Sequence, residues 1–410
     1  MKNKILRLIS SVLILLLLCI TTTGATYTEA DDDKSWHVTE KVYFGDNYTG
    51  FKYQVIPGTD NWPYGDHWKM VEMCQIPIEE CKSMSTNQLL DTVVAYPLMG
   101  DITAYDDWKT GFEVIKSSFN GLSELLTRED LDSALKDKEK SIRDSRDEFN
   151  KENPVSVTKK ETFIPANNDV DYRRMRYTEE SSALMYISLY TGNSFATEEV
   201  QSRSYPVYFI TIDGNGLNCV GSTTVYTPRG GAMQALIMNA KEIWMFSDGS
   251  QRSILFDDLS PDATTQLNNY FFQTYGLFPE SGKGPSVKYN CHSYAWYNSQ
   301  NSNYWIDNPN MYGYSQTTEG DVPVGGKVVY CGTYNGGSWG GPTAYIHSAL
   351  VSAKEYPFFP MSTNGAYISE LTSKWGSAGV YNHSISNCPY YFCKMIPLME
   401  PIPYDRKYYY

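Results

Sequence analysis

Histidine is scarce in this chain, and the spacings typical of metal sites are missing. Only five histidines occur among 410 residues. The sequence has no Cys-x-x-Cys pair and no His-Glu-x-x-His helix, the patterns that usually hold zinc. Three residues, Cys291, His292 and His347, are of types that bind metals, but their spacing matches no known metal site. We therefore expect no metal and no other cofactor.

Positive charge is also scarce. The 34 lysines and arginines are outnumbered by 47 aspartates and glutamates, which gives a net charge of -13. No stripe of basic residues with interleaved aromatics interrupts this acidic average. Because an acidic field repels polyanions, nucleic acid is not an expected partner. The same charge argues against electrostatic adhesion to an anionic cell wall.

Long apolar runs are confined to the N-terminus. Three basic residues precede an apolar run at 8–20, and small residues follow at 23–25. This order predicts a secretory signal peptide over 1–25, since the run is shorter than a membrane-spanning helix. Cys19 offers a weaker alternative, a lipid-attachment site. We expect a secreted mature protein with no membrane span and a net charge of -16, because cleavage removes three positive charges.

The cysteine count becomes odd when Cys19 is lost with the signal. The seven that remain are Cys74, Cys81, Cys219, Cys291, Cys331, Cys388 and Cys393. At least one thiol is therefore unpaired, and in an exported protein such a thiol is a candidate reactive group. Several are alternatively buried, reduced cysteines. Cys388 and Cys393 are candidates for a disulfide across a turn, whereas Cys74 and Cys81 are too far apart if their segment is helical.

The first part of the mature chain, residues 36–150, is predicted to be a helical module. It starts with an aromatic, turn-rich stretch that we expect to be irregular or to form short strands. Ser85 and Gln88 then make a capping box before an apolar periodic run. Apolar residues on one face predict further helices at 108–119 and 122–126. The charged residues 128–151 predict a solvated helix, and 151–180 reads as a linker.

Residues 181–280 are predicted to be rich in β-structure. Strands are expected at 205–212 and 219–226, with turns at 213–216 and 248–249. Ser260 and Pro261 predict the start of a helix that Gly276 ends.

Cys291 stands where a nucleophile is expected. Asn290 is a good N-cap, which places Cys291 in the first turn of a helix. The helix dipole and the free N–H groups of that turn favour a thiolate. The backbone N–H of Cys291 also contributes to an oxyanion hole in such a site, next to its Asn290 cap.

His347 is the best candidate for the base. His292 is adjacent to the cysteine, and consecutive residues on a helix point to different faces. His347 lies in an apolar, strand-like run at 344–351 that follows a glycine-rich loop. A strand histidine that faces a cysteine at a helix start is the arrangement this chemistry uses.

The order of these motifs resembles the NlpC/P60 and CHAP families of papain-fold hydrolases. Asn290-Cys291 opens a helix, a turn and strand follow at 321–330, and His347 begins the next strand. The resemblance covers roughly 282–390 and implies a papain-like domain at 281–400. It also implies a cysteine nucleophile, a histidine base and amide bonds of cell-wall peptides as substrate. The chain departs from the usual Asp-Cys-Ser-Gly of NlpC/P60 proteins, so the subfamily is not carried over.

Family members usually place a third polar residue on the strand after the histidine. Ser373 is our candidate on the expected strand 367–374, with Glu370 as the alternative and Asn364 behind them. The two lie on opposite faces, so alternation does not choose between them. His383 is a candidate for a wall of the cleft or an ordinary loop histidine.

The sequence thus predicts an α+β protein and an exported thiol hydrolase that acts on peptides or peptidoglycan-type substrates. The alternative is an inactive domain of the same fold that binds glycan or peptide through Trp296, Trp305, Trp339 and the tyrosines.

Overall fold

The computed structural model describes most of the chain after residue 37. The described residues are 38–153, 169–192, 206–209, 217–246, 251–331, 345–356, 366–390, 392–394, 402–403 and 405–410. The predicted signal peptide, 1–25, lies outside them. Within these ranges, no helix combines the length and the apolar character needed to cross a membrane.

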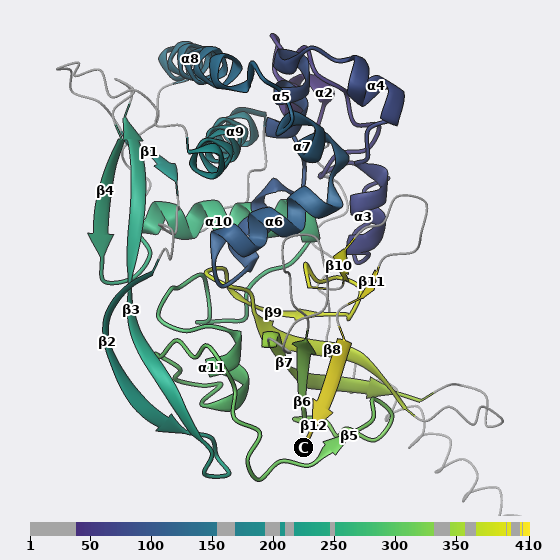
Figure 1. Cartoon of the computed structure of the whole chain (residues 1–410), viewed down its shortest axis with the longest axis vertical. Coiled ribbons are helices and arrows are strands. Elements are labelled where there is room, and N and C mark those ends of the chain that lie inside the picture. Colours follow the sequence, from purple (N-terminus) through teal and green to yellow (C-terminus); the bar gives the residue numbers. More distant parts are fainter. Residues whose placement is uncertain are drawn as a thin grey trace, which may run out of the picture. The chain divides into compact units, whose positions relative to one another are not determined.

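Helices make up the first part of the described chain (Figure 1). They are α2 (Glu40–Phe44), α3 (His67–Met73), α4 (Ile78–Ser83), α5 (Thr86–Val94), the 3-10 helix η1 (Met99–Ala104), α6 (Trp108–Ser118), α7 (Asn120–Leu125), α8 (Leu131–Glu152) and α9 (Asp169–Thr191). The capping box of Ser85 and Gln88 is present at the start of α5. The predicted helices at 108–119 and 128–151 correspond to α6 and α8. The stretch expected to lack helices contains α2.

The predicted linker at 151–180 differs from the structure. Its residues 169–180 form the first half of α9, and 154–168 lie outside the described residues. Prolines and asparagines among charged residues predicted the linker, but α9 buries its charges in ion pairs. Arg173 lies 2.9 Å from Glu180, and Arg176 lies 2.5 Å from Glu179. Since α9 contacts α2, α5 and α8, it belongs to the helical part.

The middle of the chain forms an antiparallel sheet around one long strand. It comprises β1 (Pro206–Phe209), β2 (Leu217–Tyr226), β3 (Ala232–Phe246) and β4 (Gln251–Phe256), and β3 pairs with each of the other three. The predicted turns at 213–216 and 248–249 lie outside the described residues. Helix α10 (Pro261–Tyr275) starts at the Ser260 cap and ends at Gly276, whose φ of 68° suits glycine.

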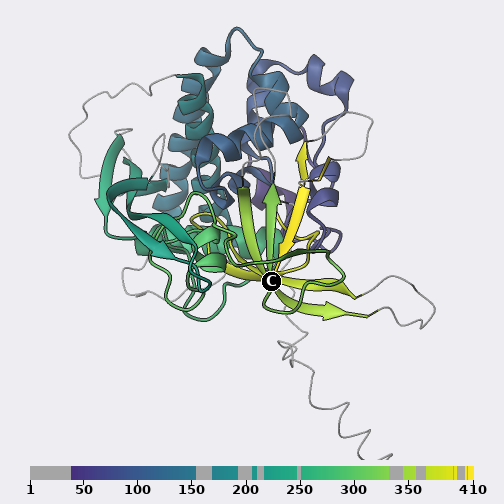
Figure 2. The same ribbon diagram turned by 60° about the horizontal axis from the view of Figure 1, so that its bottom comes forward.

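The last part of the chain is a second antiparallel sheet with a short helix, α11 (Cys291–Trp296), before it in sequence (Figure 2). The strands are β5 (Gln316–Thr317), β6 (Lys327–Cys331), β7 (Tyr345–Glu355), β8 (Tyr367–Lys374), β9 (Val380–His383) and β12 (Asp405–Tyr409). Their order is β5-β12-β6-β7-β8-β9. A separate pair joins β10 (Phe392–Lys394) to β11 (Ile402–Pro403). The expected α+β class is confirmed.

Helix α11 is held in a buried apolar cluster between the two sheets. Trp296 is fully buried there against Val329 of β6, Tyr409 of β12 and Met233 of β3. Burial of a large aromatic side chain stabilises the fold by a few kcal/mol, on the order of 2 to 3. The start of α11, at Cys291, is thereby fixed against β7.

A buried carboxylate joins three helices on the other side of this arrangement. Asp101 of η1 accepts hydrogen bonds from the hydroxyls of Tyr270 and Tyr275 of α10, at 2.8 and 2.7 Å. Its second oxygen lies 2.9 Å from His67 Nε2 of α3. Asp101 and His67 are almost fully buried, so removing the acceptor leaves polar groups without water.

We expect Asp101→Ala to lower the free energy of unfolding by about 3–5 kcal/mol, because buried hydroxyls and an imidazole lose their acceptor. Urea denaturation measures this. The control is Asp257→Ala, since Asp257 is a 91% exposed partner of Lys288, and its loss should cost less than about 1 kcal/mol. Equal effects in the two variants would contradict a structural role for Asp101.

Candidate active site

Asn290 caps the helix that carries Cys291, as predicted. Its side-chain oxygen accepts the N–H of Ser293 at 3.1 Å, and its amide donates to the Ile306 carbonyl at 2.9 Å. The same amide donates to Asp106 Oδ2 at 2.8 Å. Asn290 therefore fixes the first turn of α11 and ties it to the loop before α6.

Two backbone N–H groups, those of Ser348 and His292, hydrogen-bond to the sulfur of Cys291. Ser348 pairs with Val329 of β6, and the ladder between β7 and β8 begins at Leu350↔Thr372. The sulfur is therefore bonded at the part of β7 that precedes its pairing with β8.

Burial dominates the protonation of this site. It raises the pKa of the Cys291 thiol well above its ordinary value, and the nearby Asp106 carboxylate raises it further. Burial also raises the pKa of Asp106 to about 7. The cysteine is fully buried, so the structure holds a neutral thiol.

Two buried histidines near the site, His292 and His383, make the same pattern of hydrogen bonds. In each case a tryptophan donates to a serine, the serine bonds the imidazole, and the imidazole donates to a backbone carbonyl. Trp296 Nε1 donates to the Ser348 hydroxyl at 3.0 Å, and that hydroxyl lies 2.8 Å from His292 Nδ1. His292 Nε2 donates to a backbone carbonyl, that of Tyr345, at 3.0 Å. Both ring nitrogens are thus occupied, and burial lowers the pKa of His292 to about 4.

The same pattern of hydrogen bonds recurs at Ser373, the residue predicted to be the third catalytic residue. Its hydroxyl accepts from Trp375 Nε1 at 2.9 Å and lies 2.7 Å from His383 Nε2. His383 Nδ1 donates to the Ser384 carbonyl at 2.9 Å. Burial lowers the pKa of His383 to about 4. Ser373 therefore orients His383 rather than His347 in this structure.

His347 differs from His292 and His383 in its hydrogen bonding. It is fully buried on β7, and neither of its ring nitrogens has a hydrogen-bond partner among the described residues. The ring stacks on Tyr390 with centroids 3.8 Å apart and planes at 10°, and Tyr330 lies 5.4 Å away. Burial lowers its pKa well below the usual range, with help from the charges of His383 and His292.

The structure brings Cys291 and His347 near each other through the backbone. The N–H that bonds the sulfur belongs to Ser348, the next residue after His347. No hydrogen bond between the thiol and the His347 ring occurs in the described structure. Successive strand side chains point to opposite faces, and Ser348 faces α11, so the His347 ring lies on the Tyr390 face.

Glu370, the alternative third residue, lies far along the strand. It pairs with Ala353, six residues beyond His347 on β7. At ~3.3 Å per strand residue, this separation is roughly 20 Å. Asn364 lies outside the described residues.

Sequence reasoning missed two charged residues beside the cysteine. Asp106 comes from the helical part and has one buried carboxylate oxygen, Oδ1, without a hydrogen-bond partner. Lys374 ends β8, is fully buried, and donates to the carbonyls of Ser286 at 2.9 Å, Gly376 at 2.7 Å and Ala378. Burial lowers its pKa to about 7. Lys374 directly follows Ser373, which was predicted to be the third catalytic residue.

The predicted disulfide between Cys388 and Cys393 is not present, because Cys388 is a buried free thiol. Cys74 and Cys81 are also free. The helix assumed for their spacing is absent, because α3 ends before Cys74 and α4 begins at Ile78.

Asp106, Cys291 and His292 offer ligand atoms within 4.8 Å of one another, a possible metal arrangement. Both nitrogens of His292 are engaged by Ser348 and Tyr345, however. Since a metal ligand needs a free lone pair, this cluster does not fit a metal ion.

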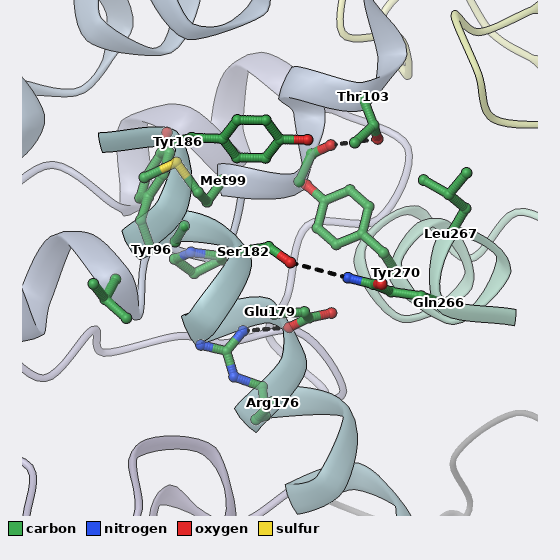
Figure 3. Close-up of a pocket in the computed structure, with 14 residues that line it drawn as sticks. Tyr96, Met99, Thr103, Arg176, Glu179, Ser182, Tyr186, Gln266, Leu267 and Tyr270 are labelled. Carbon is green, nitrogen blue, oxygen red and sulfur yellow. Dashed lines mark hydrogen bonds and ion pairs between the residues drawn. The ribbon is translucent and has the colours of Figure 1, made fainter. Parts of the chain in front are cut away.

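A separate pocket lies among helices α5, η1, α9 and α10 (Figure 3). Tyr96, Met99, Tyr186 and Tyr270 line it, together with the Arg176–Glu179 ion pair. Its volume of about 40 Å³ holds a few water molecules at most. None of the predicted site residues lines it.

Comparisons of the chain with models of known protein families, with characterised proteins and with solved structures find no match.

The buried neutral histidines predict acid destabilisation. An ordinary histidine has a pKa near 6.5, and His292 and His383 are held at about 4, so the unfolded chain binds more protons between these values. Their contribution is complete above pH 6.5 and is lost as pH falls to 4, by roughly 3 kcal/mol each at most. Asp106, with its raised pKa, opposes this loss in part.

Urea unfolding of the mature protein at pH 7 and pH 4.5 tests the sign. We expect lower stability at pH 4.5, and a smaller difference between the two pH values in His383→Gln, which has one buried imidazole fewer. Stability that rises on acidification would show that these rings are not held neutral.

Proposed function

We propose that this protein is an exported thiol hydrolase that cleaves amide bonds in peptides, with Cys291 as nucleophile and His347 as base. The observation that carries the proposal is the unpartnered imidazole. A buried ring with two unsatisfied nitrogens costs free energy, and the fold nevertheless keeps one a single residue from the peptide N–H that binds the Cys291 sulfur.

The order of elements supports the same function. A cysteine begins α11, β6 follows, the histidine lies on β7, and β8 runs beside it. This order agrees with the resemblance to NlpC/P60 and CHAP hydrolases. Cell-wall peptides are the substrate class that the resemblance implies, and the predicted signal peptide is consistent with it.

The residues suggest a division of roles. His347 takes the thiol proton, and the thiolate adds to the carbonyl carbon of the amide. The N–H groups of His292 and Ser348 lie at the sulfur and are placed to stabilise negative charge there and on the adjacent oxyanion. The amine leaves with the proton from His347, and water then releases the acyl group from Cys291.

The positions found here require a movement before this chemistry. The His347 ring must leave Tyr390 and reach the Cys291 sulfur. Lys374, a buried cation near Cys291, favours the thiolate once the site opens.

Two of the three tryptophans that the alternative of a binding module would use are buried. Trp296 and Trp305 are 0% and 3% exposed, so neither presents a face to a ligand. Trp339 lies outside the described residues.

We expect Cys291→Ala to abolish release of amines from cell-wall peptide fragments, and His347→Ala to reduce it by at least ~100-fold, the scale of general-base catalysis. Cys331→Ala is the control, because Cys331 is also a buried thiol of the second sheet. Amine release is measured with a primary-amine reagent. Activity that survives Cys291→Ala would contradict the proposal.

A further inference from the structure

A short segment of the helical part lies directly on the candidate site. We call Thr103–Asp106 the covering segment. Its first two residues end η1, and the backbone becomes extended at Tyr105, with φ -87° and ψ 157°. Ala104 and Tyr105 are buried. It ends at Asp106, the carboxylate beside Cys291.

The covering segment is held mainly through its backbone carbonyls. The Thr103 carbonyl accepts from the N–H and from the hydroxyl of Ser377, both at 3.3 Å. The Ala104 carbonyl accepts from the hydroxyl of Tyr390, the residue whose ring stacks on His347. Groups that bind carbonyls recognise a peptide chain irrespective of its side chains.

Two further contacts fix the ends of the segment. Asn290 donates to the Asp106 carboxylate at 2.8 Å, and the Tyr105 hydroxyl donates to the Pro389 carbonyl at 2.9 Å. Gly376 permits the close approach, since a Cβ there would lie 2.6 Å from the carbonyl carbon of Ala104. Its φ of +44° also favours glycine.

From these contacts we infer that the covering segment occupies the substrate cleft as an intramolecular peptide, so that Ser377, Tyr390 and Asn290 are the groups that receive a peptide substrate. The ligand class is a peptide with a small residue at the position of Ala104 and a carboxylate two residues later. This inference rests on the proposed function for the reaction but not for the binding. The protein as described is closed.

The contacts predict how closure responds to mutation. Tyr105 and Tyr43 are matched, because each is buried and donates its hydroxyl to a backbone carbonyl at 2.9 Å. Tyr43 bonds Ala95 within the helical part, away from Cys291. Loss of either hydroxyl should destabilise the fold to a similar extent, whereas only loss at Tyr105 loosens the covering segment.

The experiment measures alkylation of Cys291 by iodoacetamide in the full mature chain, with the modified cysteine identified by peptide mass spectrometry. A buried thiol reacts through local opening. We expect Tyr105→Phe to react about fivefold faster than wild type, the effect of one buried hydrogen bond, and Tyr43→Phe to react at the wild-type rate. Equal rates in all three proteins, or equal acceleration in both variants, would overturn the inference.

A second arm tests the ligand class. The hexapeptide Ile-Thr-Ala-Tyr-Asp-Asp, which copies residues 102–107, should slow alkylation in Tyr105→Phe, and a copy with Lys in place of the first Asp should not. Inhibition by both peptides or by neither would overturn the assignment of the acidic subsite.

The two proposals fail in different ways. Faster alkylation of Tyr105→Phe without any amide hydrolysis would support the cleft and contradict the proposed function. Hydrolysis by wild type at a rate that Tyr105→Phe leaves unchanged would support the function and contradict the closed cleft.

Discussion

The buried carboxylate of Asp101 fixes the helix η1, whose last residues lie on the candidate site. Its hydrogen bonds to Tyr270 and Tyr275 and its contact with His67 hold η1 between α3 and α10. The covering segment begins with the last two residues of η1, so its path over Cys291 depends on these bonds. A buried carboxylate is stable only while its partners stay in place, and these bonds therefore resist opening. Movement that uncovers the site is expected after Asp101, in the few residues up to Asp106.

The hydrogen bonds of the three buried histidines distinguish the ring that is free to transfer a proton from the two that are not. His292 and His383 each accept from a serine that a tryptophan holds, and each donates to a backbone carbonyl. These rings are fixed, neutral and unsuited to proton transfer. His347 has no such partner in the described structure and keeps both nitrogens for other use.

The local parts of this structure could be predicted from the sequence, because their causes are local. Ser85, Ser260 and Asn290 each cap a helix through a bond to a residue three positions later. The order of Cys291 and His347 on a helix and a strand was predicted in the same way.

The parts that were not predicted depend on distant contacts. Asp106 and Asn290 are 184 residues apart in sequence, and no local pattern joins them. Prolines and asparagines among charged residues suggested a linker where α9 begins. The ion pair between Arg173 and Glu180 that helps to hold this helix joins residues seven positions apart and forms only once the helix is packed. Ser373 was expected to serve His347, but the β8–β9 hairpin brings His383 to it first.

The central claim is that Cys291 and His347 form a working pair, and acylation by p-nitrophenyl acetate tests it most directly. The account predicts a burst of p-nitrophenolate from the Tyr105→Phe variant, with the acetyl group found on Cys291 by mass spectrometry. Adding His347→Ala should remove the burst while the folded far-UV spectrum is retained. A burst of the same size and rate without His347, or no acetyl group on Cys291, would contradict the claim.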